Sequence, residues 1–160
     1  MNKKTILLSL TALLSAGLLF TSCLNDENPY TVGLGATPST VTSLTAVLNG
    51  ASEKPTSTTS TVTGNFTGRL NETTRVLSYT VIYSSPFSSS LTGGHLHRIT
   101  STTAMTGGIE IPFTSLTNPI YGSYTLANQN RVDSMKNGFY YANLHTVNYP
   151  NGEIRGDIKR

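Results

Sequence analysis

Hydrophobic and polar residues alternate with a period of two along most of the chain beyond residue 40. In the segment 41–48, Leu44, Ala46 and Leu48 occupy every second position, and segment 75–83 alternates in the same way. Because successive side chains of a strand point to opposite faces, this period predicts β-strands. The predicted strands cover residues 41–48, 58–70, 75–83, 91–99, 107–113, 120–126, 139–147 and 153–158.

Turn residues separate these segments, and one segment has a helical pattern. Asn49-Gly50 and the segment 149–152, which contains Pro-Asn-Gly, favour tight turns. Residues 128–137 predict one short helix, since Val132 and Met135 lie three positions apart and Gly138 follows the last turn. About seven or eight short strands predict an all-β, antiparallel Greek-key sandwich or barrel, either immunoglobulin-like or superoxide-dismutase-like.

Two strands have features that predict their place in the sheet. The segment 58–70 offers only Val62, Phe66 and Leu70 on one poorly apolar face, which predicts a position near an edge. Pro112 lacks a backbone N–H, so segment 107–113 is also expected at an edge or a strand end. The segment 75–83 is the strongest candidate for a central strand.

The N-terminal segment has the pattern of an export signal. Lys3 and Lys4 precede the apolar run 6–20, which is too short for a committed membrane span. Cys23 is the only cysteine of the chain and directly follows Thr21 and Ser22, so no disulfide partner exists for it. This arrangement resembles the lipobox of bacterial lipoproteins, although Phe20 stands where leucine is commoner. We therefore expect a signal peptide at 1–22 and acylation of Cys23.

The expected acyl anchor sets the domain plan and the location. Residues 23–40 are polar, contain Pro and Gly, and predict a flexible tether, so the β domain is expected at 41–160. The protein is therefore expected to be exported and membrane-anchored through Cys23. Leu24 stands where an aspartate retains many lipoproteins on the inner membrane, so the outer membrane is expected, with the domain periplasmic or at the cell surface.

The charge of the chain changes when the signal peptide is removed. Loss of Lys3 and Lys4 leaves 9 basic residues against 8 acidic ones, so the net charge falls from +3 to +1. Basic residues do not cluster with aromatic ones, and a nucleic-acid partner is therefore not expected.

The chain contains three histidines, and their spacing indicates candidate metal chemistry. His95 and His97 are two positions apart on one predicted strand, so their side chains point to the same side. His145 shares a predicted strand face with Tyr141 and Asn143. If the two strands are neighbours, the three imidazoles suit copper or zinc. The alternative is structural, with the histidines bonded to one another, to a carbonyl or to Glu153.

A second pair of polar residues lies on the last predicted strand. Glu153 and Arg155 share one face of this strand, with Ile154 facing the core. Arg155 can form a bidentate bond with Glu153 or Asp157, and we expect a structural ion pair between Glu153 and Arg155 that fixes the last hairpin.

Three stretches together resemble a known family. The segments GGHLHR (93–98), GFYYANLHT (138–146) and YPNGEIRGDI (149–158), with AVLNGASEKPT (46–56), resemble the CHRD domain of chordin and of many bacterial exported proteins. The resemblance implies an immunoglobulin-like Greek-key β-barrel over about 44–158. By analogy with chordin it also implies a binding module that contacts a protein or glycan.

The motifs rank the functions that the sequence allows. A binding or structural module of the cell envelope comes first, and a copper or zinc protein using His95, His97 and His145 is the alternative. Superoxide dismutase activity is not expected, because that enzyme needs four histidines at copper, a zinc site and a disulfide. No nucleophile elbow or carboxylate pair indicates another enzyme.

Overall fold

The computed structural model describes residues 40–160. The predicted signal peptide 1–22, the predicted acylation site Cys23 and all but the last residue of the tether 23–40 lie outside the described residues. None of the helices within 40–160 has the length and apolar character that a membrane span requires.

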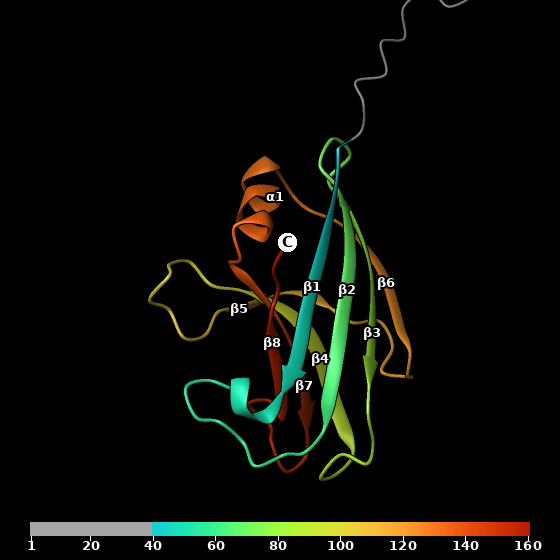
Figure 1. Ribbon diagram of the computed structural model, residues 1–160, viewed down its shortest axis with the longest axis vertical. Coiled ribbons are helices and arrows are strands. Elements are labelled where there is room, and N and C mark those ends of the chain that lie inside the picture. Colours follow the sequence, from blue (N-terminus) through green and yellow to red (C-terminus); the bar gives the residue numbers. More distant parts are fainter. Residues whose placement is uncertain (1–39) are drawn as a thin grey trace, which may run out of the picture. The chain divides into compact units, whose positions relative to one another are not determined.

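Eight strands and one α-helix make up the described domain (Figure 1). The strands are β1 (Val41–Asn49), β2 (Thr63–Asn71), β3 (Val76–Tyr83), β4 (Leu91–Arg98), β5 (Gly108–Pro112), β6 (Ile120–Thr125), β7 (Tyr140–Thr146) and β8 (Ile154–Asp157). The helices are α1 (Gln129–Lys136) and a single 3₁₀ turn, η1 (Gly50–Ser52). The predicted all-β fold with one short helix is confirmed.

The strands form one antiparallel sheet in the order β5-β4-β7-β8-β1-β2-β3-β6. Sequential hairpins join β1 to β2, β2 to β3, β4 to β5 and β7 to β8, whereas the β3–β4, β5–β6 and β6–β7 connections cross from one half of the sheet to the other. The sheet curls into a nearly closed barrel (Figure 1). This connectivity brings β4 and β7, which are distant in sequence, side by side.

Alternate residues of most strands fill the barrel interior, as the period of two predicts. The fully buried apolar side chains include Leu48, Phe66, Leu70, Leu77, Val81, Leu96, Ile120, Leu144 and Ile154. On β7 the interior face carries Tyr140, Ala142 and Leu144, so Tyr141, Asn143 and His145 lie on the outer face. The core therefore fixes which way the three histidine-bearing positions point.

The prediction that the second strand lies near an edge is wrong, because β2 lies between β1 and β3. Its weak apolar face reflects glycines at inward positions. A Cβ on Gly68 would lie 3.0 Å from the Phe66 ring and 3.2 Å from Leu77, so a side chain there would require these neighbours to shift. Pro112, by contrast, lies on the edge strand β5 as predicted.

The second strand also begins later than predicted, at Thr63 rather than at residue 58. The side chains of the preceding loop bond to a distant segment. Thr58 Oγ1 donates to the Glu153 carbonyl at 2.8 Å, and Ser60 Oγ donates to Glu153 Oε1 at 2.7 Å. These contacts hold residues 58–62 as a loop packed against the β7–β8 hairpin.

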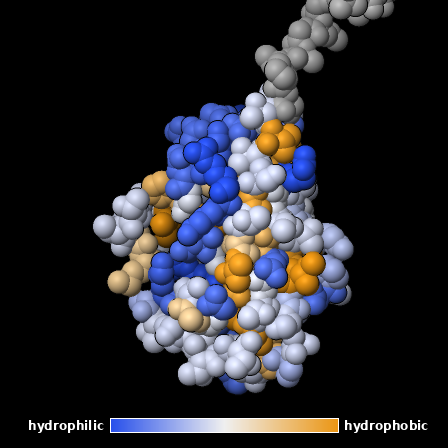
Figure 2. Space-filling view, viewed as in Figure 1, coloured by the Kyte–Doolittle hydropathy of each residue, from blue (hydrophilic) through white to orange (hydrophobic). Residues whose placement is uncertain are grey.

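Helix α1 covers the end of the barrel at which β1 begins (Figure 1). The Asn128 side chain accepts a hydrogen bond from the Arg131 amide at 3.2 Å, and Gly138 ends the segment with a φ of +78°. Val132 and Met135 are buried, whereas hydrophilic residues gather on the outer surface over α1 (Figure 2). The helix thus serves as a cap on the core.

Candidate metal centre

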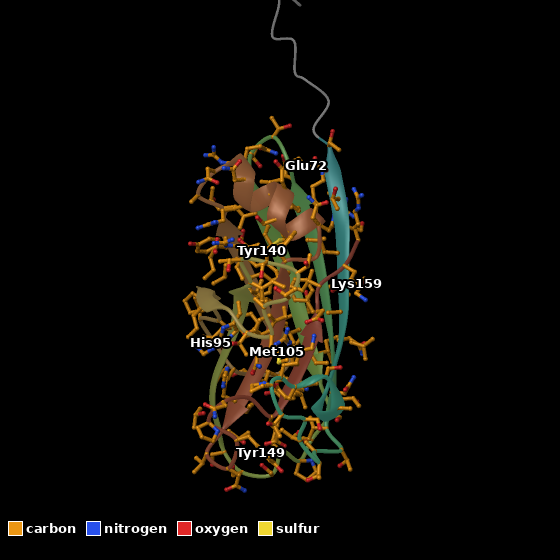
Figure 3. All side chains as sticks on the ribbon, turned by 90° about the vertical axis from the view of Figure 1, so that its left-hand side faces the viewer. Glu72, His95, Met105, Tyr140, Tyr149 and Lys159 are labelled. Carbon is orange, nitrogen blue, oxygen red and sulfur yellow. The ribbon has the colours of Figure 1, made fainter. Side chains whose placement is uncertain are left out.

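The three histidines meet on the outer face of two adjacent strands. In the β4–β7 ladder His97 pairs with Tyr141, His95 with Asn143 and Gly93 with His145. The same strands bury Leu96 and Leu144 on the other face. Figure 3 places His95 on the barrel wall between Tyr140, nearer α1, and Tyr149 at the far end. The neighbouring strands that the three-histidine prediction required are therefore present.

The three imidazole rings converge closely. The ring centroids of His95 and His145 are 5.1 Å apart, those of His95 and His97 5.5 Å, and those of His97 and His145 6.0 Å. One ring nitrogen from each residue lies within 4.8 Å of the others. This spacing is short enough for three ligands of one metal ion after a small movement of the rings.

Backbone carbonyls fix the tautomers of two of the rings. His97 Nδ1 lies 3.0 Å from the Gly107 carbonyl oxygen, and His145 Nδ1 lies 3.0 Å from the Pro150 carbonyl oxygen. Because a carbonyl only accepts, each Nδ1 carries the proton and each Nε2 holds a lone pair. Metal-binding histidines usually donate their other N–H to a carbonyl or carboxylate in this way.

The nitrogens that remain have no partner. Among the described residues, the buried side-chain nitrogen and oxygen atoms without a hydrogen bond are His95 Nδ1, His97 Nε2, His145 Nε2 and Asn143 Oδ1. All four belong to neighbouring positions of β4 and β7. Buried polar atoms are nearly always bonded in folded proteins. The concentration of orphaned atoms at one place therefore indicates a candidate ligand-binding site.

Burial keeps the imidazoles neutral and able to bind a cation. Desolvation lowers the pKa of His95 and of His145 below the usual 6.5. It lowers the pKa of His97 to about 4, and the charges of the other two histidines and of Arg155 act in the same direction. The lone pairs therefore remain available at neutral pH.

A stack of side chains positions His97. The Tyr141 ring lies parallel to the His97 ring, with centroids 4.7 Å apart, and Arg155 Cζ lies 3.5 Å from the centre of the Tyr141 ring. The Gly107 amide donates to Tyr141 Oη at 3.2 Å, so the loop before β5 is bonded to both aromatic residues. The stack holds the buried imidazole in one orientation.

The predicted ion pair between Glu153 and Arg155 is wrong. Arg155 bonds instead to Asp157 Oδ1 through Nε and Nη2, at 3.1 and 2.9 Å, and to the Met105 carbonyl through Nη1 at 2.6 Å. The Glu153 carboxylate accepts from the Ser60, Ser88 and Thr146 hydroxyls and from the Ser88 amide. These two partner sets occupy both side chains, so Glu153 is also not a partner of the histidines.

Glu53 is the first of two residues near the site that could not be identified from their spacing in the sequence. Asn143 Nδ2 donates to both oxygens of Glu53, at 3.0 and 3.1 Å, and Glu53 is only 5% exposed. Burial raises the pKa of the Glu53 carboxyl to about 7, against the opposing effects of the Asn143 bond and the Arg155 charge. The sequence did contain one indication of Glu53, because it lies in the family-like segment AVLNGASEKPT. That segment does not show which residue Glu53 contacts.

The raised pKa of Glu53 predicts a pH-dependent stability of the metal-free protein. Between pH 4.5 and about 7 the unfolded chain loses the Glu53 proton while the folded chain keeps it, so rising pH destabilises the fold. Glu53→Gln removes this loss, and the variant should gain up to about 3 kcal/mol relative to the wild type between pH 5 and pH 8.

Urea unfolding of the wild type and of Glu53→Gln at pH 5 and pH 8 measures this gain. The lowered pKa of His97 produces the opposite pH trend in both proteins, so this trend cancels when one unfolding free energy is subtracted from the other. Asp133→Asn, a change at an exposed side chain of α1, is the matched control and should show no such gain. An equal stability difference at pH 5 and pH 8 would mean that Glu53 is ionised throughout.

Gly93 is a second residue that the histidine motif alone did not single out. A Cβ on Gly93 would lie 3.1 Å from His95 Cε1 and 3.4 Å from His95 Nε2, so the ring lies back over the glycine. The buried nitrogen of His95 without a hydrogen-bond partner is Nδ1 rather than Nε2. The first glycine of GGHLHR thus makes room for the His95 ring.

Comparison with known proteins gives one match. The sequence model of the CHRD domain matches residues 44–158. No curated protein and no solved structure matches the chain. The matched range covers almost all of the described barrel and contains His95, His97 and His145, so the resemblance seen in the sequence motifs is confirmed.

Proposed function

The chain belongs to the CHRD-domain family, and we propose that it is an exported, lipid-anchored member that binds one copper or zinc ion. The ligands are His95, His97 and His145. One observation carries the proposal: three buried ring nitrogens from adjacent strands converge and have no hydrogen-bond partner. An unsatisfied buried polar atom costs roughly 1–3 kcal/mol, and one bound cation would satisfy all three.

The chemistry of the ligands supports copper or zinc over calcium or magnesium. Imidazole nitrogen suits zinc and copper, whereas calcium and magnesium prefer oxygen ligands. Three nitrogens bound to one zinc ion at about 2.0–2.1 Å lie roughly 3.4 Å apart, so the rings need to close by about 1 Å or somewhat more. His95 and His145 are only partly buried and have space for this movement.

The proposal is a binding function rather than catalysis. The chain has three histidines and a single cysteine, fewer than the ligand set and disulfide of a copper-zinc superoxide dismutase. We rank recognition of a protein or glycan partner second. Its support in the described residues is a few separate exposed apolar side chains, such as Ile109 and Tyr121, rather than a converging group.

Metal content tests the binding function. The segment 24–160, produced without a histidine tag, should retain about one copper or zinc ion per chain after dialysis against trace metal. The variant with all three histidines changed to phenylalanine should retain none. Tyr121→Phe, an aromatic change at an exposed position of β6, should bind like the wild type. Equal retention by the triple variant would exclude the site.

The location within the cell is a separate part of the proposal. It is supported by the apolar run 6–20 and by Cys23 directly after Thr21 and Ser22. Full-length protein should fractionate with membranes, and Cys23→Ala should move it to the soluble fraction. Unchanged detergent partitioning of Cys23→Ala would show that acylation of Cys23 does not anchor the chain.

The glycine beside His95 gives a sharper prediction for the site. Gly93→Val would place branched carbons where the His95 ring lies, since even a Cβ there is 3.1 Å from the ring. The expected result is a roughly 10- to 100-fold loss of metal affinity, measured by competition with a chromophoric chelator. Thr92→Val, at the exposed neighbouring position of β4, should keep the wild-type affinity. If both variants bind equally, His95 is not a ligand.

A further inference from the structure

We infer that the metal ion held by His95, His97 and His145 keeps one coordination position for a small monovalent anion from solvent. The inference rests on the proposed function, because it concerns the same site. It goes beyond that function by assigning the class of ligand that the bound metal takes up.

The first argument is the number of protein ligands. Within residues 40–160, no carboxylate or thiolate joins the three histidines in the cluster. The nearby carboxylates are held elsewhere: Asp157 by Arg155 and Lys54, and Glu53 by Asn143. Glu153 is enclosed by hydroxyl groups. Three ligands do not complete the coordination of zinc or copper(II), so one position is left for a ligand from solvent.

The second argument is access. His97 is 8% exposed and forms the inner wall of the site, whereas His95 and His145 are only partly buried. A small ligand can therefore reach the metal past His95 and His145.

The third argument is charge. Three neutral imidazoles leave the two positive charges of the metal uncompensated. Arg155 is the ionised side chain whose charge acts on His97, and it has the same sign as the metal. Asp157 is half-exposed and offsets Arg155 through their ion pair, while Lys54 bonds to the same carboxylate. Charges interact strongly in a partly desolvated site, so an anion is favoured over a neutral ligand.

Azide is the probe that tests the inference. Segment 24–160, loaded with one equivalent of copper(II), is titrated with azide and followed by absorption and electron paramagnetic resonance spectra. We expect a new azide-to-copper charge-transfer band that saturates at one azide per copper, with copper still bound to the protein. Perchlorate at equal ionic strength should leave the spectra unchanged. Lys159→Met, at an exposed side chain outside the cluster, should titrate like the wild type.

The possible failures separate the inference from the proposed function. If copper is not retained before azide is added, the metal site itself is wrong. If copper is retained but its spectra do not respond to azide, the coordination shell is closed and the inference alone is overturned. Release of copper into the filtrate as azide is added overturns the inference too, because the anion then competes with the histidines instead of joining them.

Discussion

Replacing Glu153 with alanine is expected to lower the free energy of unfolding by about 3–4 kcal/mol. The Glu153 carboxylate is 0% exposed and accepts four hydrogen bonds, three from the hydroxyls of Ser60, Ser88 and Thr146 and one from the Ser88 amide. It joins the loop before β2, the loop before β4 and the β7–β8 hairpin. Truncation leaves these donors facing a void.

Urea unfolding of the metal-free protein at neutral pH measures this loss. Asp133→Ala removes a carboxylate from an exposed position of α1 and is the matched control, with an expected change within about 0.5 kcal/mol. The bonds also hold the pKa of Glu153 below its usual value despite burial. The stabilisation is therefore lost as pH falls through that lowered pKa. A Glu153→Ala protein as stable as the control would show that water replaces the carboxylate without cost.

Replacing Arg155 with methionine is expected to cost about 2–3 kcal/mol of stability. Methionine fills similar volume, so the loss reflects the bonds to Asp157 and the Met105 carbonyl and the contact with the Tyr141 ring. Arg155 is only 2% exposed, but Asp157 is half-exposed and regains water after the change. Because Asp157 is rehydrated, the loss of unfolding free energy stays below that expected for breaking a fully buried ion pair.

The matched control is Lys159→Met, which removes the same charge from an exposed side chain. Thermal and urea unfolding of both variants should separate them clearly, with Lys159→Met close to the wild type. A stability change inside about 0.5 kcal/mol would place Arg155 in a solvated setting.

The alternation of residues predicted the strands and their inward faces well, because that pattern is local. Leu77, Tyr79 and Val81 face the core at alternate positions of β3, and Tyr140 and Leu144 do so on β7. The start of β2 was wrong because Thr58 and Ser60 bond to Glu153, which lies far away in the sequence. Hydrogen bonds between residues far apart in the sequence do not affect the local alternation of hydrophobic and polar residues, so that alternation cannot reveal them.

The candidate site was predictable only in part for the same reason. Two-residue spacing placed His95 and His97 on one face, but their meeting with His145 depends on the pairing of β4 with β7. Spacing also put Glu153 and Arg155 on one face without specifying their partners. The carbonyls of Gly107 and Pro150, which fix the tautomers, come from loops whose paths the sequence does not encode locally.

X-ray absorption spectroscopy of segment 24–160 loaded with one equivalent of zinc tests the central claim most directly. The account predicts three imidazole nitrogens at about 2.0–2.1 Å from zinc, with the multiple-scattering pattern of imidazole rings, and at least one further light-atom ligand. The triple histidine-to-phenylalanine variant should lose this signal. A zinc environment made only of oxygen ligands, or one that is unchanged in the triple variant, would contradict the metal site.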